Sequence, residues 1–419
     1  MPTAEFRRIL SPMNRVVITG MGAVSTLGES LEDISLALQN GHSNVIFSDE
    51  RKERGFRSPL MSALPEINLK AELDRKSRKF MPEAALLVAL ATNRALLSAD
   101  LQRDGIAKDD VGVVVGNDSS CAPLPELMET LDEYGESHFL GSNTVIKVMN
   151  STASMNLGPF LGARGINLTL SAACASGAHA VGLAYQLIRS GQQRVVFAGG
   201  AQEINWLSMV SFDALNSFST RFDNPAQASR PFDKDRDGLV PGGGGAMLIL
   251  ESLDSASARD ARIYGEIVGY GFSSDGDHLT LPSGDGAKRA MEATLHDAGA
   301  TTGDVDYISA HATATMLGDA AEATAINGLF GSEGPPVAST KSMTGHECWM
   351  AGASETIYAC LMLRDRFLAP NLNFTEQEEG TPKINVLGQI LHSEVDTILS
   401  NSFGFGGTNA SLLLRRFKQ

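Results

Sequence analysis

Cysteine is scarce in this chain. Only four occur among 419 residues, at positions 121, 174, 348 and 360, and their spacing matches neither a metal site nor a disulfide framework. This usage is typical of proteins in a reducing compartment, so we expect a cytoplasmic location. Long apolar runs are also missing, since none approaches the roughly 18 residues of a membrane span. Residues 1–17 (MPTAEFRRILSPMNRVV) lack the apolar core of a signal peptide.

Positive charge is in deficit. The chain has 34 Lys and Arg against 49 Asp and Glu, a formal net charge of −15. An acidic surface disfavours nucleic acid and anionic membranes as partners, so we expect neither. An acidic protein partner would have to bind at a local basic patch.

The composition is otherwise that of a globular protein. Hydrophobic residues make up 43% of the chain and charged residues 20%, which excludes low-complexity disorder as its main state. The length predicts two or three domains or one large layered α/β body.

Strand-like and helix-like segments alternate along the chain. Short β-rich runs are expected at 15–20, 111–116, 194–199, 247–251, 263–270, 305–309 and 396–400, and helical spacing at 82–98, 182–190, 287–299 and 354–366. This alternation predicts an α/β fold with largely parallel sheets. The polar segment 251–262 is the expected seam between two halves.

Two glycine motifs are interpreted structurally rather than as nucleotide sites. Gly20-Met21-Gly22 lacks the third small residue and the spaced acidic group of a dinucleotide fingerprint, so we expect a strand-to-helix turn. Residues 242–245 (GGGG) lack the following Lys-Ser/Thr of a phosphate loop, so we expect tight backbone packing.

Cys174 is the candidate nucleophile. It lies in SAACASG (171–177), between a strand-like segment and an alanine-rich helical stretch. A turn at a helix N-terminus offers free N–H groups and partial positive charge, which would favour the thiolate. The small neighbours would let a substrate approach, although an inert buried cysteine fits the same local pattern.

Two of the eight histidines are candidate partners for this cysteine. His311 follows the strand-like VDYIS, and His346 follows Lys341 in a turn of small residues. His179 is expected to pack in the core, and the other five lie in polar contexts and are expected to be solvated. The glycine-rich turn 401–409 could present backbone N–H groups to an oxyanion. Together these features predict acyl-transfer chemistry.

The chain resembles the β-ketoacyl-acyl-carrier-protein synthases. The resemblance runs from RVVITGMGAVSTLG to SNSFGFGGTNASLLLRR and includes, in family order, SAACASGAHA, ASRPFDKDRDG, HATAT, STKSMTGH and NSFGFGGTNAS. It implies a thiolase-like αβαβα layered fold made of two similar βα halves. We therefore expect a lead-in at 1–14, a half carrying the cysteine at 15–260 and a half carrying the histidines at 261–419.

The resemblance also implies roles for individual residues. The catalytic set would be Cys174, His311, His346 and Lys341, with the backbone N–H groups of Cys174 and Phe405 as the oxyanion hole. Acidic residues around this set would be Glu355, Glu322 and Asp319, and the pantetheine and acyl pocket would use Thr313, Thr315, Phe403 and Phe405, both phenylalanines being placed in a gating loop. No cofactor and no catalytic metal are implied, but a structural monovalent cation is expected near Ser309, Glu355, Ser400 and Asn401.

Some residues depart from the family pattern. Ala312 and Ala314 replace the glycine and serine of the usual HGTST, and Glu347-Cys348-Trp349-Met350 replaces a stretch rich in glycine and alanine. Trp349 is expected to narrow or redirect a neighbouring wall. PGGGGAM and the EINW segment resemble type I synthases more than type II.

The expected function is decarboxylative condensation of a malonyl carrier with a cysteine-bound acyl chain in fatty acid elongation. The expected partners are an acyl carrier protein and a second copy of the chain in a homodimer. The carrier protein is expected to dock at Arg75, Lys76, Arg78, Lys79 and Lys147. The alternatives are a ketosynthase or weakly catalytic subunit of a polyketide or polyene pathway, and a cysteine hydrolase. A thiolase would need a second, C-terminal cysteine, and a nucleotide-binding oxidoreductase would need the missing glycine and acidic spacing.

Overall fold

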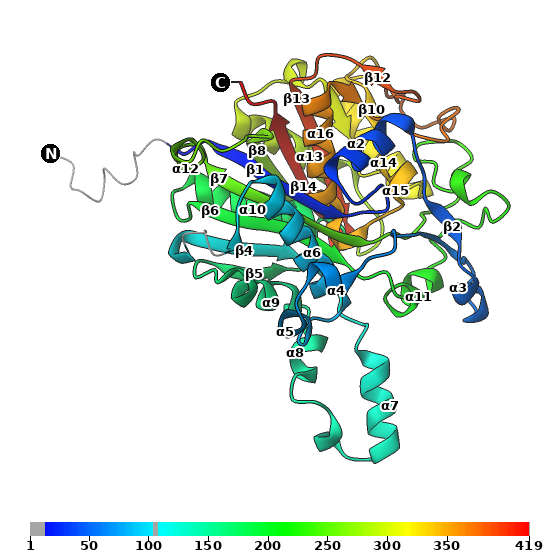
Figure 1. Cartoon of the computed structure of the whole chain (residues 1–419). Coiled ribbons are helices and arrows are strands. Elements are labelled where there is room, and N and C mark those ends of the chain that lie inside the picture. Colours follow the sequence, from blue (N-terminus) through cyan, green and yellow to red (C-terminus); the bar gives the residue numbers. More distant parts are fainter. Residues whose placement is uncertain (1–12, 104–107, 419) are drawn as a thin grey trace.

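The computed structural model describes residues 13–103 and 108–418 (Figure 1). Most of the expected lead-in, residues 1–12, lies outside the described residues. The strands are β1 (Val16–Val24), β2 (Val45–Phe47), β3 (Leu60–Ser62), β4 (Val111–Gly116), β5 (Asn167–Leu170), β6 (Val195–Gln202), β7 (Gly244–Ser252), β8 (Gly265–Ser274), β9 (Tyr307–Ser309), β10 (Val337–Ala338), β11 (Phe367–Leu368), β12 (Leu391–His392), β13 (Thr397–Gly404) and β14 (Thr408–Arg415).

Helices connect most of these strands. They are α2 (Leu31–Asn40), α3 (Asp49–Glu53), α4 (Leu69–Glu72), α5 (Arg75–Arg78), α6 (Glu83–Ser98), α7 (Leu124–Tyr134), α8 (Thr144–Val148), α9 (Thr152–Leu161), α10 (Ser176–Arg189), α11 (Trp206–Ala214), α12 (Leu253–Ala258), α13 (Gly284–Ala298), α14 (Met316–Phe330), α15 (Lys341–Thr344) and α16 (Ala351–Asp365). The strands and helices predicted from the sequence are all present, with boundaries shifted by a few residues.

The central sheet shows an internal duplication. Its ten strands run in the order β10-β9-β13-β14-β8-β1-β7-β6-β4-β5. The five strands of the first half stand in the order β5-β4-β6-β7-β1, and those of the second half repeat it as β10-β9-β13-β14-β8. The halves join through a short pairing of β1 with β8 at Val16–Ile18. The prediction of two similar βα halves is therefore confirmed.

The prediction of largely parallel sheets is wrong. Parallel pairing is confined to β4 with β5 and β6, and to β9 with β10 and β13. The other five pairings in this sheet are antiparallel. The reason is that each half ends on a strand that returns beside its predecessor, β7 beside β6 and β14 beside β13, instead of crossing over through a helix.

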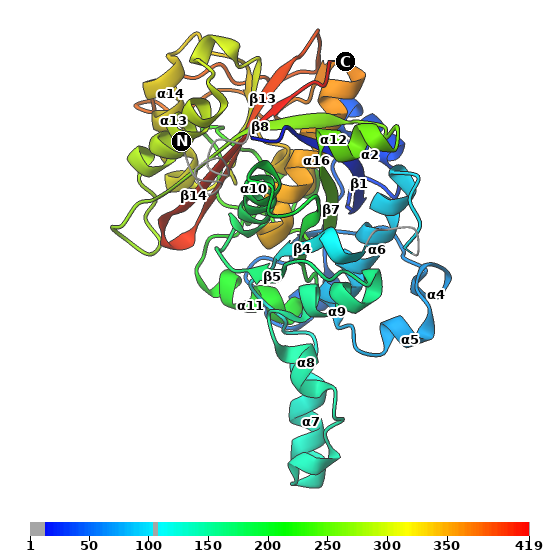
Figure 2. The ribbon, with the colours of Figure 1, turned by 90° about the vertical axis from the view of Figure 1, so that its left-hand side faces the viewer.

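The helices form three layers around the two halves of the sheet. Helices α6 and α9 cover the outer face of the first half, and α13 and α14 cover that of the second (Figure 2). Helices α10 and α16 pack against each other and against strands of both halves, so they form the middle layer. The apolar cores lie between these layers, which gives the expected αβαβα arrangement.

The glycine motifs let backbones approach closely. A Cβ at Gly22 would lie 2.2 Å from the Ala91 carbonyl oxygen of α6, and one at Gly244 would lie 2.0 Å from the Val24 oxygen. The tight packing predicted for residues 242–245 is confirmed. The turn predicted at Gly20–Gly22 is wrong, because both glycines lie inside β1, where they let α6 sit against the strand.

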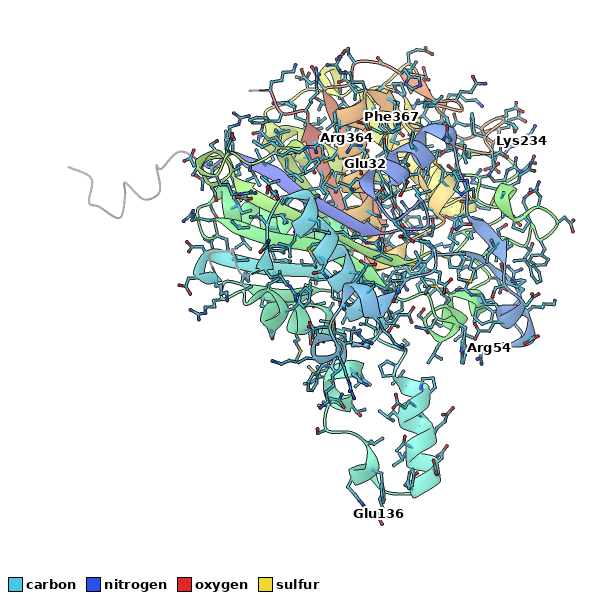
Figure 3. All side chains as sticks on the ribbon, viewed as in Figure 1. Glu32, Arg54, Glu136, Lys234, Arg364 and Phe367 are labelled. Carbon is cyan, nitrogen blue, oxygen red and sulfur yellow. The ribbon has the colours of Figure 1, made fainter. Side chains whose placement is uncertain are left out.

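An arm projects from the body between β4 and β5. It carries α7 and α8 and stands clear of the layers in both views (Figures 1 and 2), with Glu136 at its tip (Figure 3). None of the α7 side chains is buried. The exposed apolar residues of the arm include Met128 on α7 and Phe139 after it. The base of the arm lies beside α5, because the Asn143 Nδ2 donates a hydrogen bond to the Lys79 carbonyl at 3.1 Å.

Candidate active site

Cys174 lies on a tight turn between β5 and α10, as the sequence predicted. Ala173 before it has a positive φ of 47°. The Ser176 hydroxyl accepts a hydrogen bond from the Ala172 N–H at 2.8 Å and donates one to the Ala173 carbonyl at 2.6 Å. Asp118 at the end of β4 accepts from the Ala173 N–H at 3.0 Å. These bonds hold a strained turn that places the sulfur at the carboxyl edge of the sheet.

The two predicted histidines lie beside this sulfur. His346 Nε2 is 3.0 Å from Cys174 Sγ. The sulfur and one nitrogen of each imidazole lie within 4.8 Å of one another. The rings of His311 and His346 are nearly perpendicular, with centroids 5.2 Å apart. The structure therefore brings together three residues separated by up to 172 positions in the chain.

Burial opposes the thiolate that the sequence pattern predicts for Cys174. Burial raises the pKa of Cys174 to about 12. The positive charge of Lys341 and the backbone N–H groups of Cys174 and Phe405 lower this pKa, but they do not offset the loss of water. The helix N-terminus was expected to decide the charge of the sulfur, and desolvation outweighs it.

Both imidazoles are neutral. Burial lowers the pKa of His311 and of His346 well below the ordinary value, and the charge of Lys341 lowers both further. The Nδ1 atoms of both rings are buried and have no hydrogen-bond partner, so neither tautomer is locked. One sulfur and two imidazole nitrogens are also ligand types that zinc prefers.

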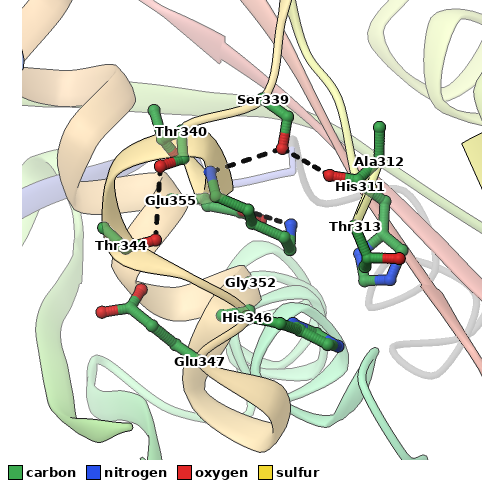
Figure 4. Close-up of polar contacts among 12 residues, drawn as sticks. His311, Ala312, Thr313, Ser339, Thr340, Thr344, His346, Glu347, Gly352 and Glu355 are labelled. Carbon is green, nitrogen blue, oxygen red and sulfur yellow. Dashed lines mark hydrogen bonds and ion pairs between the residues drawn. The ribbon is translucent and has the colours of Figure 1, made fainter. Parts of the chain in front are cut away.

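Lys341 and Glu355 form a fully buried ion pair, and the charge of Lys341 acts on both rings (Figure 4 labels Glu355 and the two histidines). Lys341 begins α15 and Glu355 lies on α16, and their side chains are 2% and 1% exposed. Burial raises the pKa of Glu355, and the charge of Lys341 opposes that rise. The pair therefore places a compensated charge behind the histidines rather than in contact with the sulfur.

Glu322 and Asp319 hold the loop that carries His311. Glu322 Oε1 accepts hydrogen bonds from the His311 N–H at 2.9 Å and from Asn401 Nδ2 at 3.2 Å. Asp319 accepts from the Thr313 N–H at 3.0 Å. Burial raises the pKa of Glu322 to about 7 and that of Asp319 to about 6. Both carboxyl groups therefore position the backbone of the loop that carries His311.

The Phe405 N–H faces the same sulfur. Together with the Cys174 N–H it lowers the pKa of the thiol, so both donors point at Sγ. Gly404 makes this approach possible, because a Cβ there would lie 2.8 Å from the Ala172 carbonyl oxygen and 3.1 Å from the Cys174 nitrogen. Phe405 itself begins the turn after β13, whereas Phe403 lies in β13, so only Phe405 occupies the predicted loop.

A cavity of about 440 Å³ leads to the sulfur. Its walls include all three reactive residues. They also include all four residues predicted for the pantetheine and acyl pocket, namely Thr313, Thr315, Phe403 and Phe405. The Thr313 and Thr315 hydroxyls are 3.1 Å apart. The outer walls of the cavity are residues 279–283 and 316–318, where Leu279 and Leu317 are exposed.

The residues expected near a monovalent cation are only partly free to bind one. Ser309 Oγ and Glu355 Oε2 are buried without a hydrogen-bond partner, and Ser309 pairs with Ser400 across β9 and β13. Asn401 is already engaged, because its Oδ1 accepts from Ser411 and its Nδ2 donates to Glu322. Hard oxygen ligands suit such a cation, and its binding here stays a prediction.

The predicted docking residues lie on the surface around α5. Arg75, Lys76 and Lys79 are exposed, while Arg78 is half-buried and donates to the Leu73 carbonyl at 3.1 Å. Lys147 is half-buried on α8, at the base of the arm. Asp118, which anchors the cysteine turn, was not predicted from the sequence. Its position directly after a buried strand was the available signal.

A cysteine beside two neutral imidazoles, with two backbone N–H groups facing its sulfur, is suited to covalent acyl transfer. Comparison with known families agrees with this chemistry. The domain "Beta-ketoacyl synthase, N-terminal domain" matches residues 13–256, and "Beta-ketoacyl synthase, C-terminal domain" matches residues 264–375. The chain belongs to the beta-ketoacyl synthase family.

Individual relatives are similar over almost the whole chain. It is 38% identical to 3-oxoacyl-[acyl-carrier-protein] synthase 1 of Escherichia coli over 97% of this chain and 100% of the relative. The crystal structure of a beta-ketoacyl synthase from Burkholderia phymatum superimposes with a TM-score of 0.91 at 36% identity, covering 97% and 100% of the two chains. A type II polyketide ketosynthase solved in complex with its acyl-carrier protein gives 0.85 at 28% identity, over 97% and 100%.

Proposed function

We propose that this chain is a β-ketoacyl-acyl-carrier-protein synthase of fatty acid elongation. The observation that carries this proposal is the sulfur of Cys174 at 3.0 Å from His346 Nε2, with His311 beside both, at the inner end of a cavity open to the surface. Membership of the family supplies the substrate class, a thioester on a carrier protein.

In the first half-reaction the Cys174 sulfur attacks the carbonyl carbon of an acyl-carrier thioester. His346 Nε2 accepts the thiol proton as the new C–S bond forms. The tetrahedral oxyanion accepts hydrogen bonds from the Cys174 and Phe405 N–H groups, and loss of one such donor typically costs about 3 kcal/mol. The carrier thiolate then leaves and takes the proton back from His346.

In the second half-reaction a malonyl carrier occupies the cavity. His311 and His346 donate N–H groups to its thioester oxygen, which receives the electron pair as carbon dioxide leaves. The resulting enolate carbon attacks the acyl carbonyl on Cys174, the C–S bond breaks with its electron pair on sulfur, and the thiolate takes up one proton from solvent. Because neither imidazole tautomer is locked, each ring can carry its proton on the nitrogen that each half-reaction needs.

The carrier protein is proposed to dock at α5. Carrier proteins of this kind are acidic, and the exposed cations Arg75, Lys76 and Lys79 offer a local positive surface on a chain of net charge −15. Lys147 lies on α8, which begins directly after Asn143, the residue that bonds the Lys79 carbonyl.

A homodimer is also proposed, and two features support it. Strand β5 is the edge of the ten-stranded sheet and is partly exposed, with Leu168 at 41%. The arm also exposes apolar side chains, both on α7 and in the residues after it. No other part of the described chain covers them. An exposed edge strand and an uncovered apolar face both favour pairing with another chain.

The division at residue 260 and the cytoplasmic location remain our proposals. The repeated strand order supports two halves joined between β7 and β8. All four cysteines are free, which fits a reducing compartment. No helix among the described residues is long and apolar enough to cross a membrane.

An elongation assay with three variants tests the proposed function. Cys174→Ala is expected to abolish condensation while leaving some decarboxylation of the malonyl carrier. His311→Ala is expected to impair decarboxylation and condensation most. His346→Ala is expected to impair both and also to slow acylation of Cys174, because its Nε2 accepts the thiol proton. Undiminished elongation by Cys174→Ala would contradict the proposal, and release of free acid without a malonyl carrier would favour a cysteine hydrolase instead.

A further inference from the structure

Two chains must meet at the Cys174 sulfur during condensation, the bound acyl group and the arm of the malonyl carrier. This inference rests on the proposed function. The carrier stays outside the protein, so its arm has to enter by the open cavity, whose outer walls are residues 279–283 and 316–318. The acyl group then needs separate room next to the sulfur.

Close packing fills the remaining surroundings of the sulfur. Cys174 belongs to a buried apolar cluster, five of whose members do not line the cavity. These five are Phe56, Met209, Phe218, Cys348 and Trp349, each at most 7% exposed. The largest of them is Trp349, which lies three residues after His346 and packs in the same buried cluster as Cys174.

The indole of Trp349 is held on two sides. Its Nε1–H donates a hydrogen bond to Ser119 Oγ at 3.1 Å. Its ring lies 5.9 Å from that of Phe212, between ring centroids. Phe212 in turn stacks on Phe405 at 6.1 Å, so the indole is part of an aromatic group that reaches the oxyanion turn.

The backbone under Trp349 has no room to withdraw. A Cβ at either Gly177 or Gly200 would lie 3.0 Å from the Trp349 carbonyl oxygen, so only glycine fits beneath it. Cys348, the residue before it, has a positive φ of 41°. The segment is therefore clamped between α10 and β6, and only the side chain itself could move.

We propose that Trp349 closes the acyl site behind Cys174 and restricts the enzyme to short acyl groups. A short acyl group fits beside the carrier arm in the existing cavity, whereas a long chain has to displace an anchored indole from a close-packed interior. Extra methylenes forced into such an interior are costly, so the rate of acylation falls as the chain grows. Trp349 is thus a specificity-determining residue.

The test measures the initial rate of Cys174 acylation by intact mass, using the full chain and a carrier protein loaded with acetyl, butyryl, octanoyl or dodecanoyl groups. In the unaltered protein acetyl transfer is expected to be at least tenfold faster than dodecanoyl transfer. Trp349→Ala is expected to raise the dodecanoyl-to-acetyl ratio at least tenfold. Trp349→Phe, which retains an aromatic ring and guards against misfolding of the alanine variant, is expected to raise it about threefold.

Two further variants separate the indole from general effects. Ser119→Ala removes the anchor and is expected to raise the same ratio less than Trp349→Ala. Trp206→Ala removes an indole that is only partly buried at the edge of the same cluster, where Arg54 lies over its ring at 4.1 Å, and is expected to leave the ratio unchanged.

Dodecanoyl transfer as fast as acetyl transfer in the unaltered protein would overturn the inference. An unchanged ratio in folded Trp349→Ala and Trp349→Phe would also overturn it. Acylation by no chain length at all would contradict the proposed function itself, and the inference with it.

Discussion

At the scale of single residues, the acid–base state of Cys174 decides how the site works. The sequence pattern favours a thiolate, but desolvation at the inner end of the cavity raises the pKa of Cys174 more than Lys341 and the nearby backbone N–H groups lower it. Reaction then depends on the proton acceptor at 3.0 Å, His346 Nε2, rather than on a standing negative charge.

The pH dependence of alkylation tests this state. With the pKa of Cys174 at about 12, the thiolate fraction rises about tenfold per pH unit throughout the range below it. Iodoacetamide labelling of Cys174, measured by peptide mass spectrometry, should therefore keep rising between pH 7 and 9. Cys174→Ala corrects for labelling elsewhere, and a plateau below pH 8 would show that the thiol ionises early.

Gly404 governs the oxyanion hole through the close approach of its backbone to the cysteine turn. In Gly404→Ala the new Cβ would meet the Ala172 carbonyl oxygen and the Cys174 nitrogen, so the Phe405 N–H has to move from the sulfur. Acylation is expected to slow by about 10²-fold to 10³-fold, as when an oxyanion donor is lost.

Gly406→Ala is the matched control for this substitution. Its Cβ would meet nothing within 4 Å, although its φ of 76° is strained for alanine, so its loss should be mainly of stability. Equal acylation rates in the two variants would show that the close approach at Gly404 is irrelevant to catalysis.

At the scale of elements, the turn between α15 and α16 carries a buried acid next to the reactive histidine. Glu347 accepts hydrogen bonds from Ser354 and Tyr358, and the Tyr358 hydroxyl lies 2.8 Å from that of Ser25 (Figure 4 shows Glu347 beside His346). Burial raises the pKa of Glu347 to about 8, so this carboxyl group is mostly protonated at neutral pH. The network ties the start of α16 to the end of β1.

Glu347 therefore makes stability fall as the pH rises. Between its ordinary value of 4.5 and about 8, the native state keeps a proton that the unfolded chain has released. Its contribution is complete below pH 4.5 and is lost through pH 8. In Glu347→Gln the free energy of unfolding should therefore fall less steeply with pH, by about 1.4 kcal/mol per pH unit.

Denaturant unfolding between pH 5.5 and 7.5 measures this slope. Glu292→Gln, at an exposed position on α13, is the control and should leave the slope as it is. The same slope in both variants would mean that Glu347 is already ionised in the folded protein.

Most elements were predictable from the sequence because apolar runs such as VGVVVG and alanine-rich helical spacing leave few alternatives. The direction of the strands was not predictable, because the sequence of a returning strand such as β7 has the same apolar pattern as any other buried strand. The glycines of β1 were misjudged because their role depends on α6, which passes beside them. His311 and His346 were identified by motif, but only the fold shows that their rings meet at one sulfur.

At the scale of the whole molecule, the site faces outward through one cavity while the basic surface at α5 offers a place for the carrier. Reversing the charges of Arg75 and Lys76 to Glu should raise the KM for an acyl carrier at least several-fold and flatten its salt dependence, with kcat little changed. Steady-state kinetics at several ionic strengths measure both effects.

The control for this surface is Arg164→Glu with Arg194→Glu. Both arginines are exposed and lie where β5 and β6 begin, at the opposite end of the sheet from the sulfur. The control should alter neither the KM nor its salt dependence. Equal effects of the two double variants would mean that the carrier responds to overall charge rather than to α5.

The central claim is that the Cys174 sulfur takes the acyl group from a carrier thioester. Intact mass spectrometry of the protein after incubation with acetyl carrier alone tests it most directly. The account predicts a gain of one acetyl group, mapped by peptide analysis to Cys174 and absent from Cys174→Ala. An unchanged mass, or an acetyl group on any other residue, would contradict it.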